Sequence, residues 1–470
     1  MNPDVTATPD FDAVRGEFDL PAAFPPAVLV EAESVASHGA GPDRVDATDV
    51  ELVTIDPPGS KDLDQALGVV RTDAGFRVHY AIADLGAVVT PGGALDEEVR
   101  RRGQTVYLPD GSVPLHPPVL SEGASSLLPD GPRAAVLWTI DLDVAGEPTS
   151  VDVRRAVVRS RARLDYAGVQ ADVDSGVEGR VHPAISGLAE LGPLRRALAV
   201  QRGAIELELP EQEVVPDGDG GWTVRVRRRV PVEDWNAEMS LLTGTSAAKI
   251  MLGAGIGLLR TLPAPEADAV AALRRTAATL GVDWPDGTTP AQVLGALPRD
   301  TPTALALRRA ATTLLRGAGY AAFDQATPPP ADPGHGGIGA PYAHVTAPLR
   351  RLVDRFGTEI CLALVAGTPV PGWVRAALPS LPELMAGSDS LASKVSRACV
   401  DRTEATLLAS RVGEEFDVVV LRPGDPGEVY LQDPPVLARC TGRLELGATV
   451  RVRLAEADPA TGRMSFTAAR

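Results

Sequence analysis

The chain of 470 residues contains few cysteines and no paired cysteine motif. The three that occur are scattered: Cys361, Cys399 and Cys440. A disulfide framework or a structural zinc site needs closely spaced cysteines or histidines, so both are disfavoured, and a reducing compartment is favoured. Lysine is equally scarce, and all but three of the 45 basic residues are arginines.

Long hydrophobic runs are also missing. No apolar stretch approaches the roughly 20 residues that span a bilayer, and the first residues, MNPDVTATPDFD, have neither the basic start nor the apolar core of a secretory signal. We therefore expect no membrane association and a cytoplasmic location. Hydrophobic residues make up 44% of the chain and charged residues 23%, which is ordinary for a globular protein of two or three domains.

Positive charge is in deficit, with a net charge of −17. Proteins that bind nucleic acids usually carry a basic surface, so composition alone disfavours such a ligand. Net charge is a global sum, however, and two arginine-rich runs form local exceptions. They contain Arg154, Arg155, Arg159, Arg161, Arg163, Arg225, Arg227, Arg228 and Arg229. These runs fit either a phosphate-binding surface or a solvated sheet face balanced by acidic neighbours.

Residue patterns divide the chain into three parts. Residues 1–50 are predicted to form a lead-in with one short helix near residues 25–35, and residues 51–412 a domain of strands interleaved with helices. The segment 327–342 is rich in proline and glycine, which predicts a long irregular loop. Five short β-rich runs in residues 413–470 predict a small barrel of the OB type.

The expected helices of the middle part follow from hydrophobic periodicity. They cover residues 95–102, 193–202, 235–252, 265–280, 308–315, 347–364 and 388–412.

Three aspartates form the most informative group of residues. A strand ends at Asp56, a Pro-Pro-Gly turn follows, and Asp62 and Asp64 come next with the spacing that puts both on one face of an extended segment. Converging carboxylates with no histidine or cysteine beside them favour Mg²⁺, with Mn²⁺ as a second choice. Such a site suits phosphodiester hydrolysis. Taken alone, the segment fits a solvated polar turn as well, or the metal site of an unrelated hydrolase.

The surrounding motifs narrow these alternatives. The stretches TIDPPGSKDLDQAL, HYAIADL, TVYLPDGSVPLHPP, SRARLDYAGV, VEDWNAEMSLLTG and GHGGIGAPYAHVTAPLRRLVD occur in this order. Together they resemble the RNB family of ribonuclease II and ribonuclease R over roughly residues 50–365. The resemblance implies an α+β fold, in which an RNB catalytic domain with a mixed sheet surrounded by helices precedes a C-terminal OB-like β-barrel. It also implies Mg²⁺-dependent hydrolysis of single-stranded RNA from the 3′ end to nucleoside 5′-monophosphates.

The resemblance assigns roles to individual residues. It makes Asp56, Asp62 and Asp64 catalytic metal ligands and Arg350 the group that stabilises charge on the scissile phosphate. It makes Tyr107, Tyr166, Glu238 and Arg351 RNA-binding residues. A late family glutamate falls at Val400 or Glu404 and cannot be assigned, and His335 and His344 are expected to contact RNA or hydrogen-bond rather than bind metal.

One position departs from the family pattern. The family has a fourth aspartate directly after Asp64, where this chain has Gln65. One charge lost at about 4 Å, with an effective dielectric constant near 20, is worth about 4 kcal/mol before solvent compensation. We therefore expect a second metal to bind weakly. The alternative to an enzyme is an RNA-binding protein with a degraded site.

The family resemblance also implies what this chain lacks. Cold-shock-type domains usually precede the catalytic domain, and 50 residues cannot contain one. We expect a monomer that binds single-stranded RNA with reduced affinity and processivity, and the sequence identifies no protein partner.

Overall fold

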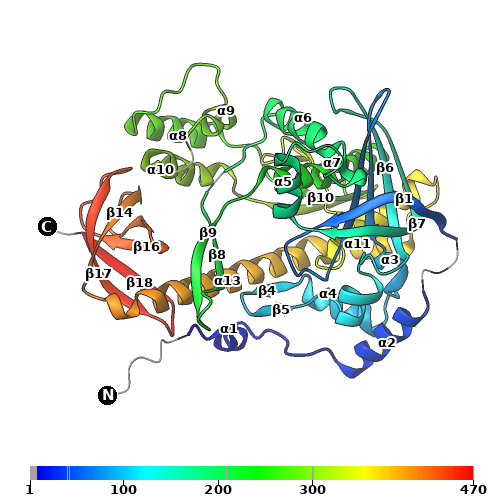
Figure 1. Cartoon of the computed structure of the whole chain (residues 1–470), viewed down its shortest axis with the longest axis horizontal. Coiled ribbons are helices and arrows are strands. Elements are labelled where there is room, and N and C mark those ends of the chain that lie inside the picture. Colours follow the sequence, from blue (N-terminus) through cyan, green and yellow to red (C-terminus); the bar gives the residue numbers. More distant parts are fainter. Residues whose placement is uncertain (1–7, 40, 42, 208, 299–300, 469–470) are drawn as a thin grey trace.

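The computed structural model describes residues 8–39, 41, 43–207, 209–298 and 301–468. It combines helices and sheets, and two separate β-barrels lie at opposite ends of the molecule (Figure 1). The expected α+β fold with a C-terminal barrel is confirmed. No described helix has the length and apolar character required to cross a membrane.

The lead-in forms two helices, α1 (Phe11–Glu17) and α2 (Pro26–Ser37). The side chain of Asp10 caps α1 by accepting from the amide of Ala13 at 2.9 Å. Phe11 stacks edge-on against Trp222, and Val28 and Ala32 of α2 join the core of the first barrel. The lead-in therefore packs on the parts of the chain that follow it.

The first barrel closes from five strands: β1 (Val45–Ile55), β2 (Gln65–Thr72), β3 (Gly75–Ala83), β6 (Arg133–Asp143) and β7 (Pro148–Leu164). All neighbouring pairs are antiparallel except β1 and β7, which close the barrel in parallel. The mixed sheet expected from the sequence therefore curls back on itself. Alternating residues such as Val69, Val78 and Trp138 are fully buried in its core.

Two helices cover the barrel beside the aspartate segment. They are α7 (Pro231–Ala254) and α11 (Leu352–Val365), and the two pack against each other. The helix expected from residue 347 begins only at Leu352, because residues 347–351 form a turn in which Arg351 is extended and pairs with Gln104. The helix expected at residues 308–315 begins earlier, as α10 (Pro302–Ala311), because Thr301 caps it and Pro302 suits a first helical turn.

The remaining described helices and short strand pairs, apart from the long helix and the hairpin beside the second barrel, complete this part of the chain. The other helices are α3 (Leu85–Val88), α4 (Ala94–Arg102), α5 (Tyr166–Asp174), α6 (Leu188–Gln201), α8 (Ala267–Thr279), α9 (Pro290–Gly295) and α12 (Gly372–Ala377). The short strand pairs are β4 (Val106–Leu108) with β5 (Gly111–Val113), β10 (Gly257–Thr261) with β11 (Gly319–Phe323), and β12 (Gly334–His335) with β13 (Ala340–Pro341). The last pair lies inside the expected irregular loop.

The second barrel contains β14 (Glu415–Arg422), β15 (Gly427–Gln432), β16 (Pro435–Thr441), β17 (Thr449–Asp458) and β18 (Arg463–Ala468). Its core is built around Phe416 and Phe466, whose rings meet edge to face. The long helix α13 (Leu381–Leu408) runs from the strand pair β4–β5 to this barrel, and the hairpin β8 (Glu211–Pro216)–β9 (Trp222–Arg227) packs against α13 (Figure 1).

Candidate functional site

The loop that carries the aspartates is anchored at several points. The amide of Asp56 donates to the carbonyl of Leu164 at 3.2 Å, which ties the end of β1 to β7. Gly59 has a φ of +87°, as the turn between β1 and the Asp-Leu-Asp segment requires. Past this turn, Ser126 Oγ accepts from the amide of Leu63 and donates to the carbonyl of Lys61. The loop is therefore held by strand and side-chain contacts on both sides.

Asp56 and Asp62 influence each other electrostatically. Burial raises the pKa of Asp56 to about 6, the charge of Asp62 adds to this rise, and the guanidinium of Arg350 opposes it. Asp62 Oδ2 accepts a hydrogen bond from the hydroxyl of Tyr107 at 2.9 Å. The two carboxylates and the arginine are thus close enough for their charges to act on one another.

Asp64 is almost fully buried and joins this site to the turn before α11. Its Oδ1 accepts from the amide of Leu349 at 2.6 Å, and its Oδ2 lies 3.6 Å from Arg350 Nε. Burial raises the pKa of Asp64 well above its usual value, and Arg350 and the Leu349 amide only partly oppose that. The side chain of Arg350 stays 50% exposed, so its guanidinium is accessible to a ligand.

A hollow of about 290 Å³ opens in front of Arg350 and Tyr107. It is lined by Gln104, Thr105, Tyr107, Arg350, Arg351, Ala392 and Ser396. Tyr107 is 49% exposed, so its ring can offer a stacking face while its hydroxyl contacts Asp62. The hollow has the position expected for a substrate beside the aspartates.

Arg351 lies next to this hollow but is committed to an ion pair. Its Nε and Nη2 contact the two carboxylate oxygens of Asp354 at 2.5 and 2.8 Å, and the side chain of Asp354 is fully buried. The carboxylate also accepts from the amide of Ala347 at 2.7 Å. Arg351 therefore braces the turn that presents Arg350, whereas its expected contact with RNA stays a prediction.

Tyr166, at the start of α5, lies on the other side of Asp56. Burial raises the pKa of its phenol and the charge of Asp56 raises it further, so the two groups are near each other. The hydroxyl of Tyr166 accepts from Asn236 Nδ2 of α7 at 3.4 Å. Tyr107 and Tyr166 thus flank the carboxylates from two directions.

Gln65 is fixed by a buried tyrosine that the sequence did not single out. The hydroxyl of Tyr80 on β3 donates to Gln65 Oε1. Ser240 of α7 is a hydrogen-bond partner of Tyr80, and Ser240 Oγ lies 2.9 Å from Thr346 Oγ1. Tyr80, Ser240 and Thr346 therefore belong to the site. All three stand in the matching motifs, although the resemblance assigned a role to none of them.

Two glutamates considered from the sequence lie elsewhere. Glu238 is buried on α7, and the nearest charges that act on it are Arg195, Arg202 and Arg196, not the aspartates. Glu404 accepts from Gln212 Nε2 at 2.5 Å and from the amide of Leu437 at 3.2 Å, at the junction of α13, β8 and the second barrel. Neither has a described contact with Asp56, Asp62 or Asp64.

The two histidines of the long loop make ring and hydrogen-bond contacts. His344 Nδ1 lies 2.7 Å from the hydroxyl of Tyr320, and His335 and His344 both pack edge-on against Tyr342. Burial lowers the pKa of both imidazoles, so they are neutral near pH 7.

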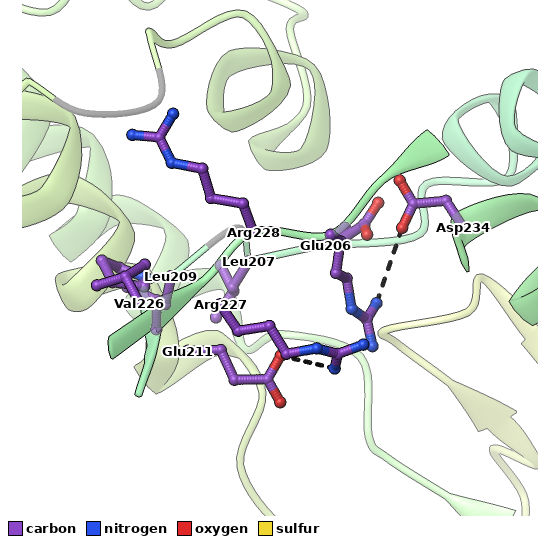
Figure 2. A pocket seen from close by; sticks show the side chains of 10 residues that line it. Glu206, Leu207, Leu209, Glu211, Val226, Arg227, Arg228 and Asp234 are labelled. Carbon is purple, nitrogen blue, oxygen red and sulfur yellow. Dashed lines mark ion pairs between the residues drawn. The ribbon is translucent and has the colours of Figure 1, made fainter. Parts of the chain in front are cut away.

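The arginine-rich runs are largely neutralised by neighbouring groups. Arg155 pairs with Asp84 and Glu359, Arg227 with Glu211 and Glu233, and Arg229 with Asp234. The hollow of about 470 Å³ beside Arg227 is lined by acidic and basic side chains together (Figure 2). The local basic surface suggested by the sequence is therefore much weaker than the count of arginines implies.

The carboxylate oxygens are chemically suitable ligands for a cation, but they are not arranged as a complete set of metal ligands. Buried oxygens with raised pKa values are what a bound Mg²⁺ would stabilise. Yet across the described residues no three acidic, histidine or cysteine side chains are grouped to hold a metal ion. The reason is that Asp64 faces the Leu349 amide and Arg350, and Asp62 is engaged by Tyr107.

Family comparisons agree with the division of the chain. The model of the RNB domain matches residues 44–361, and that of the RNase II-type exonuclease C-terminal S1 domain matches residues 414–469. The chain is 32% identical over 331 residues to ribonuclease R of Escherichia coli, covering 66% of this chain and 39% of that protein. It is 28% identical over 445 residues to exosome complex exonuclease RRP44 homolog A of Arabidopsis thaliana, covering 88% of this chain and 46% of that protein. The chain thus spans less than half the length of these relatives.

The fold is shared with a solved structure, that of Mycoplasma genitalium RNase R in complex with ribose methylated single-stranded RNA. The TM-score is 0.87 at 20% identity, and the match covers 98% of this chain and 77% of that one.

Proposed function

The chain belongs to the RNB domain family, and from this premise we propose that it is a hydrolase that shortens single-stranded RNA from its 3′ end. The observation that carries the proposal is that Asp56, Asp62 and Asp64 interact with Arg350 and Tyr107. Arg350 and Tyr107 in turn line an accessible hollow. The order of the family motifs along the sequence does not by itself say whether these residues lie close together in space. The activity of the similar ribonucleases R supports the same conclusion.

Each side chain has a distinct task in this proposal. Arg350 is exposed enough to bind the scissile phosphate and stabilise its developing charge, while Asp64 orients its guanidinium. The ring of Tyr107 stacks on the terminal base, and Tyr166 holds the nucleotide from the other side of Asp56. These contacts position the 3′ end before any bond is broken.

We include Mg²⁺ in the proposal, with Mn²⁺ as a substitute. Asp56 and Asp62 would hold it together with the RNA phosphate, since Asp64 is engaged by Arg350 and Leu349. A bound cation of this kind activates water and stabilises the leaving oxygen, which would yield nucleoside 5′-monophosphates. Its binding would also remove the electrostatic cost that raises the pKa of Asp56.

The test uses single-stranded RNA labelled at its 5′ end. We expect a ladder of shortened products with Mg²⁺ and none with EDTA. The Asp64→Asn variant should also give none, because its side-chain amide is neutral and cannot form the ion pair that orients the Arg350 guanidinium. RNA binding should survive in that variant. Shortening by Asp64→Asn at the wild-type rate would refute the assignment of the site, and binding without shortening by the wild type would leave an RNA-binding protein with a degraded site.

A further inference from the structure

The position that departs from the family pattern, Gln65, is built into a chain of hydroxyl groups. Thr346, in the turn before α11, contacts Ser240 of α7, and Ser240 contacts Tyr80 of β3. The hydroxyl of Tyr80 ends the chain by donating to Gln65 Oε1. The chain therefore links the turn before α11, α7 and β3 in series, and only Tyr80 contacts the amide oxygen.

The direction of this last hydrogen bond determines what Gln65 offers to a ligand. A phenol has one proton to donate, and burial raises the pKa of Tyr80, so the proton stays on the hydroxyl. Once Oε1 accepts it, the carbonyl faces Tyr80 and the amino group faces away from it. Within the described part of the chain, Gln65 Nε2 donates a hydrogen bond to no residue. The Nε2 atom is also not among the buried polar atoms that lack a partner.

Asp56 lies close to the same tyrosine, because its charge contributes to the pKa of Tyr80 as it does to that of Tyr166. In the strand register Val53 pairs with Leu67, which puts Gln65 beside the end of β1, next to Asp56. Gln65 thus lies at the end of β2 beside Asp56, and its amino group is on the side of the amide that faces away from Tyr80.

We propose that Tyr80 fixes the Gln65 amide so that its amino group donates a hydrogen bond to a phosphate oxygen of bound RNA, and that Gln65 is not a metal ligand. Gln65 is then an RNA-binding residue at a position where the family has an aspartate, and Tyr80 is the residue that positions it. The inference rests on the proposed function, because it requires RNA at this site. A neutral donor on an anionic phosphate holds the RNA without needing a second cation at that point.

The experiment measures RNA binding in EDTA by fluorescence anisotropy, so that a metal contributes nothing. Gln65→Met keeps the size of the side chain and removes the donor, and we expect binding about tenfold weaker. Tyr80→Phe leaves the donor in place but frees the amide to rotate, and a smaller loss is expected. The double variant should bind like Gln65→Met alone, because Tyr80 acts only through Gln65.

Controls separate this effect from loss of folding or of the whole site. Gln292→Met removes a hydrogen-bonded, exposed glutamine of α9 and should leave binding unchanged. Thermal melting checks each variant, and Ser240→Ala replaces Tyr80→Phe if the latter does not fold.

Two results would overturn the inference. One is unchanged binding by Gln65→Met in EDTA together with a higher Mg²⁺ requirement for activity, which would make the amide oxygen a metal ligand. The other is additive losses in the double variant, which would mean that Tyr80 acts independently. A wild-type protein that fails to bind RNA in EDTA and in Mg²⁺ would instead refute the proposed function itself.

Discussion

Neighbouring arginines in the turn before α11 have opposite environments, although the sequence presents them as a pair. Arg350 is half exposed and faces Asp64, whereas Arg351 is mostly buried against Asp354. A ligand can reach the first, while the second holds the turn together. Adjacent residues of the same type can therefore differ in whether they are open to a ligand or committed to packing.

The two environments predict opposite phenotypes. Arg350→Ala should lower kcat by two orders of magnitude or more, because it removes charge stabilisation in the transition state, and change the melting temperature little. Arg351→Ala should lower the free energy of unfolding by about 3–5 kcal/mol, because the carboxylate of Asp354 stays buried without its partner. Thermal melting and single-turnover kinetics on both variants check this. Equal losses of stability would contradict it.

The motifs that contribute residues near the aspartates were predictable. Which side chains of each helix point toward the aspartates was not. Asp56, Asp62 and Asp64 follow from a motif within one loop, and Arg350 from a second motif. On α7, Asn236 and Ser240 are four residues apart and share the face toward the site, while Glu238 lies midway between them and points to the other side. A matching motif locates the helix, and only the packing decides which residue of it reaches the site.

At the scale of elements, the junction between α13, β8 and the second barrel depends on one carboxyl group. Glu404 accepts from Gln212 and from the Leu437 amide, and Gln212 also donates to the carbonyl of Pro435 at 2.7 Å. Three elements from distant parts of the chain thus meet at a buried acid. The sequence could not assign Glu404 because its partners lie on a hairpin and a strand far along the chain.

The junction predicts a pH-dependent stability. Burial raises the pKa of Glu404 to about 8, so the folded state holds its proton more tightly than the unfolded state does. The contribution is therefore complete below about pH 4.5 and is lost as the pH rises toward 8. We expect the free energy of unfolding to fall by on the order of 3 kcal/mol over this range.

Glu404→Gln tests that prediction, because the amide oxygen can keep both acceptor contacts without titrating. Urea unfolding at several pH values should give a flatter profile for this variant than for the wild type. The control is Glu178→Gln, at an exposed position, and its profile should match the wild type. Equal slopes for all three proteins would mean that Glu404 is not the responsible group.

At the scale of the whole molecule, acidic charge limits how RNA can be held. The net charge is −17, and many arginines of the two rich runs are engaged by aspartates and glutamates. Binding must therefore rely on stacking and on a few local contacts instead of a broad basic surface.

This balance predicts a weak salt dependence of RNA binding. With about three phosphate contacts, the slope of log K against log salt should be about −2, since each contact to a single strand contributes about −0.7. We also expect early dissociation from long substrates, seen as many intermediates on a gel. Anisotropy titrations from low to moderate salt measure the slope, and a value of about −5 or steeper would show an extended basic path.

The division into a domain with a mixed sheet and a C-terminal barrel was largely predictable, because strand patterns and the family resemblance both indicate it. The closure of the first barrel was not. It depends on the parallel pairing of β1 with β7, whose register contains shifts near Leu52. Local propensity carries no information about which distant strand completes a sheet.

The contact between Asp64 and the Leu349 amide has a consequence for protein synthesis. These groups are 285 residues apart in the chain, and Arg350 comes from the same late segment. A nascent chain emerges from the ribosome N-terminus first, so the aspartates appear long before the arginine that completes their site. The unfinished polypeptide therefore cannot form the contacts of Asp64 with Leu349 and Arg350 until that late segment has left the ribosome.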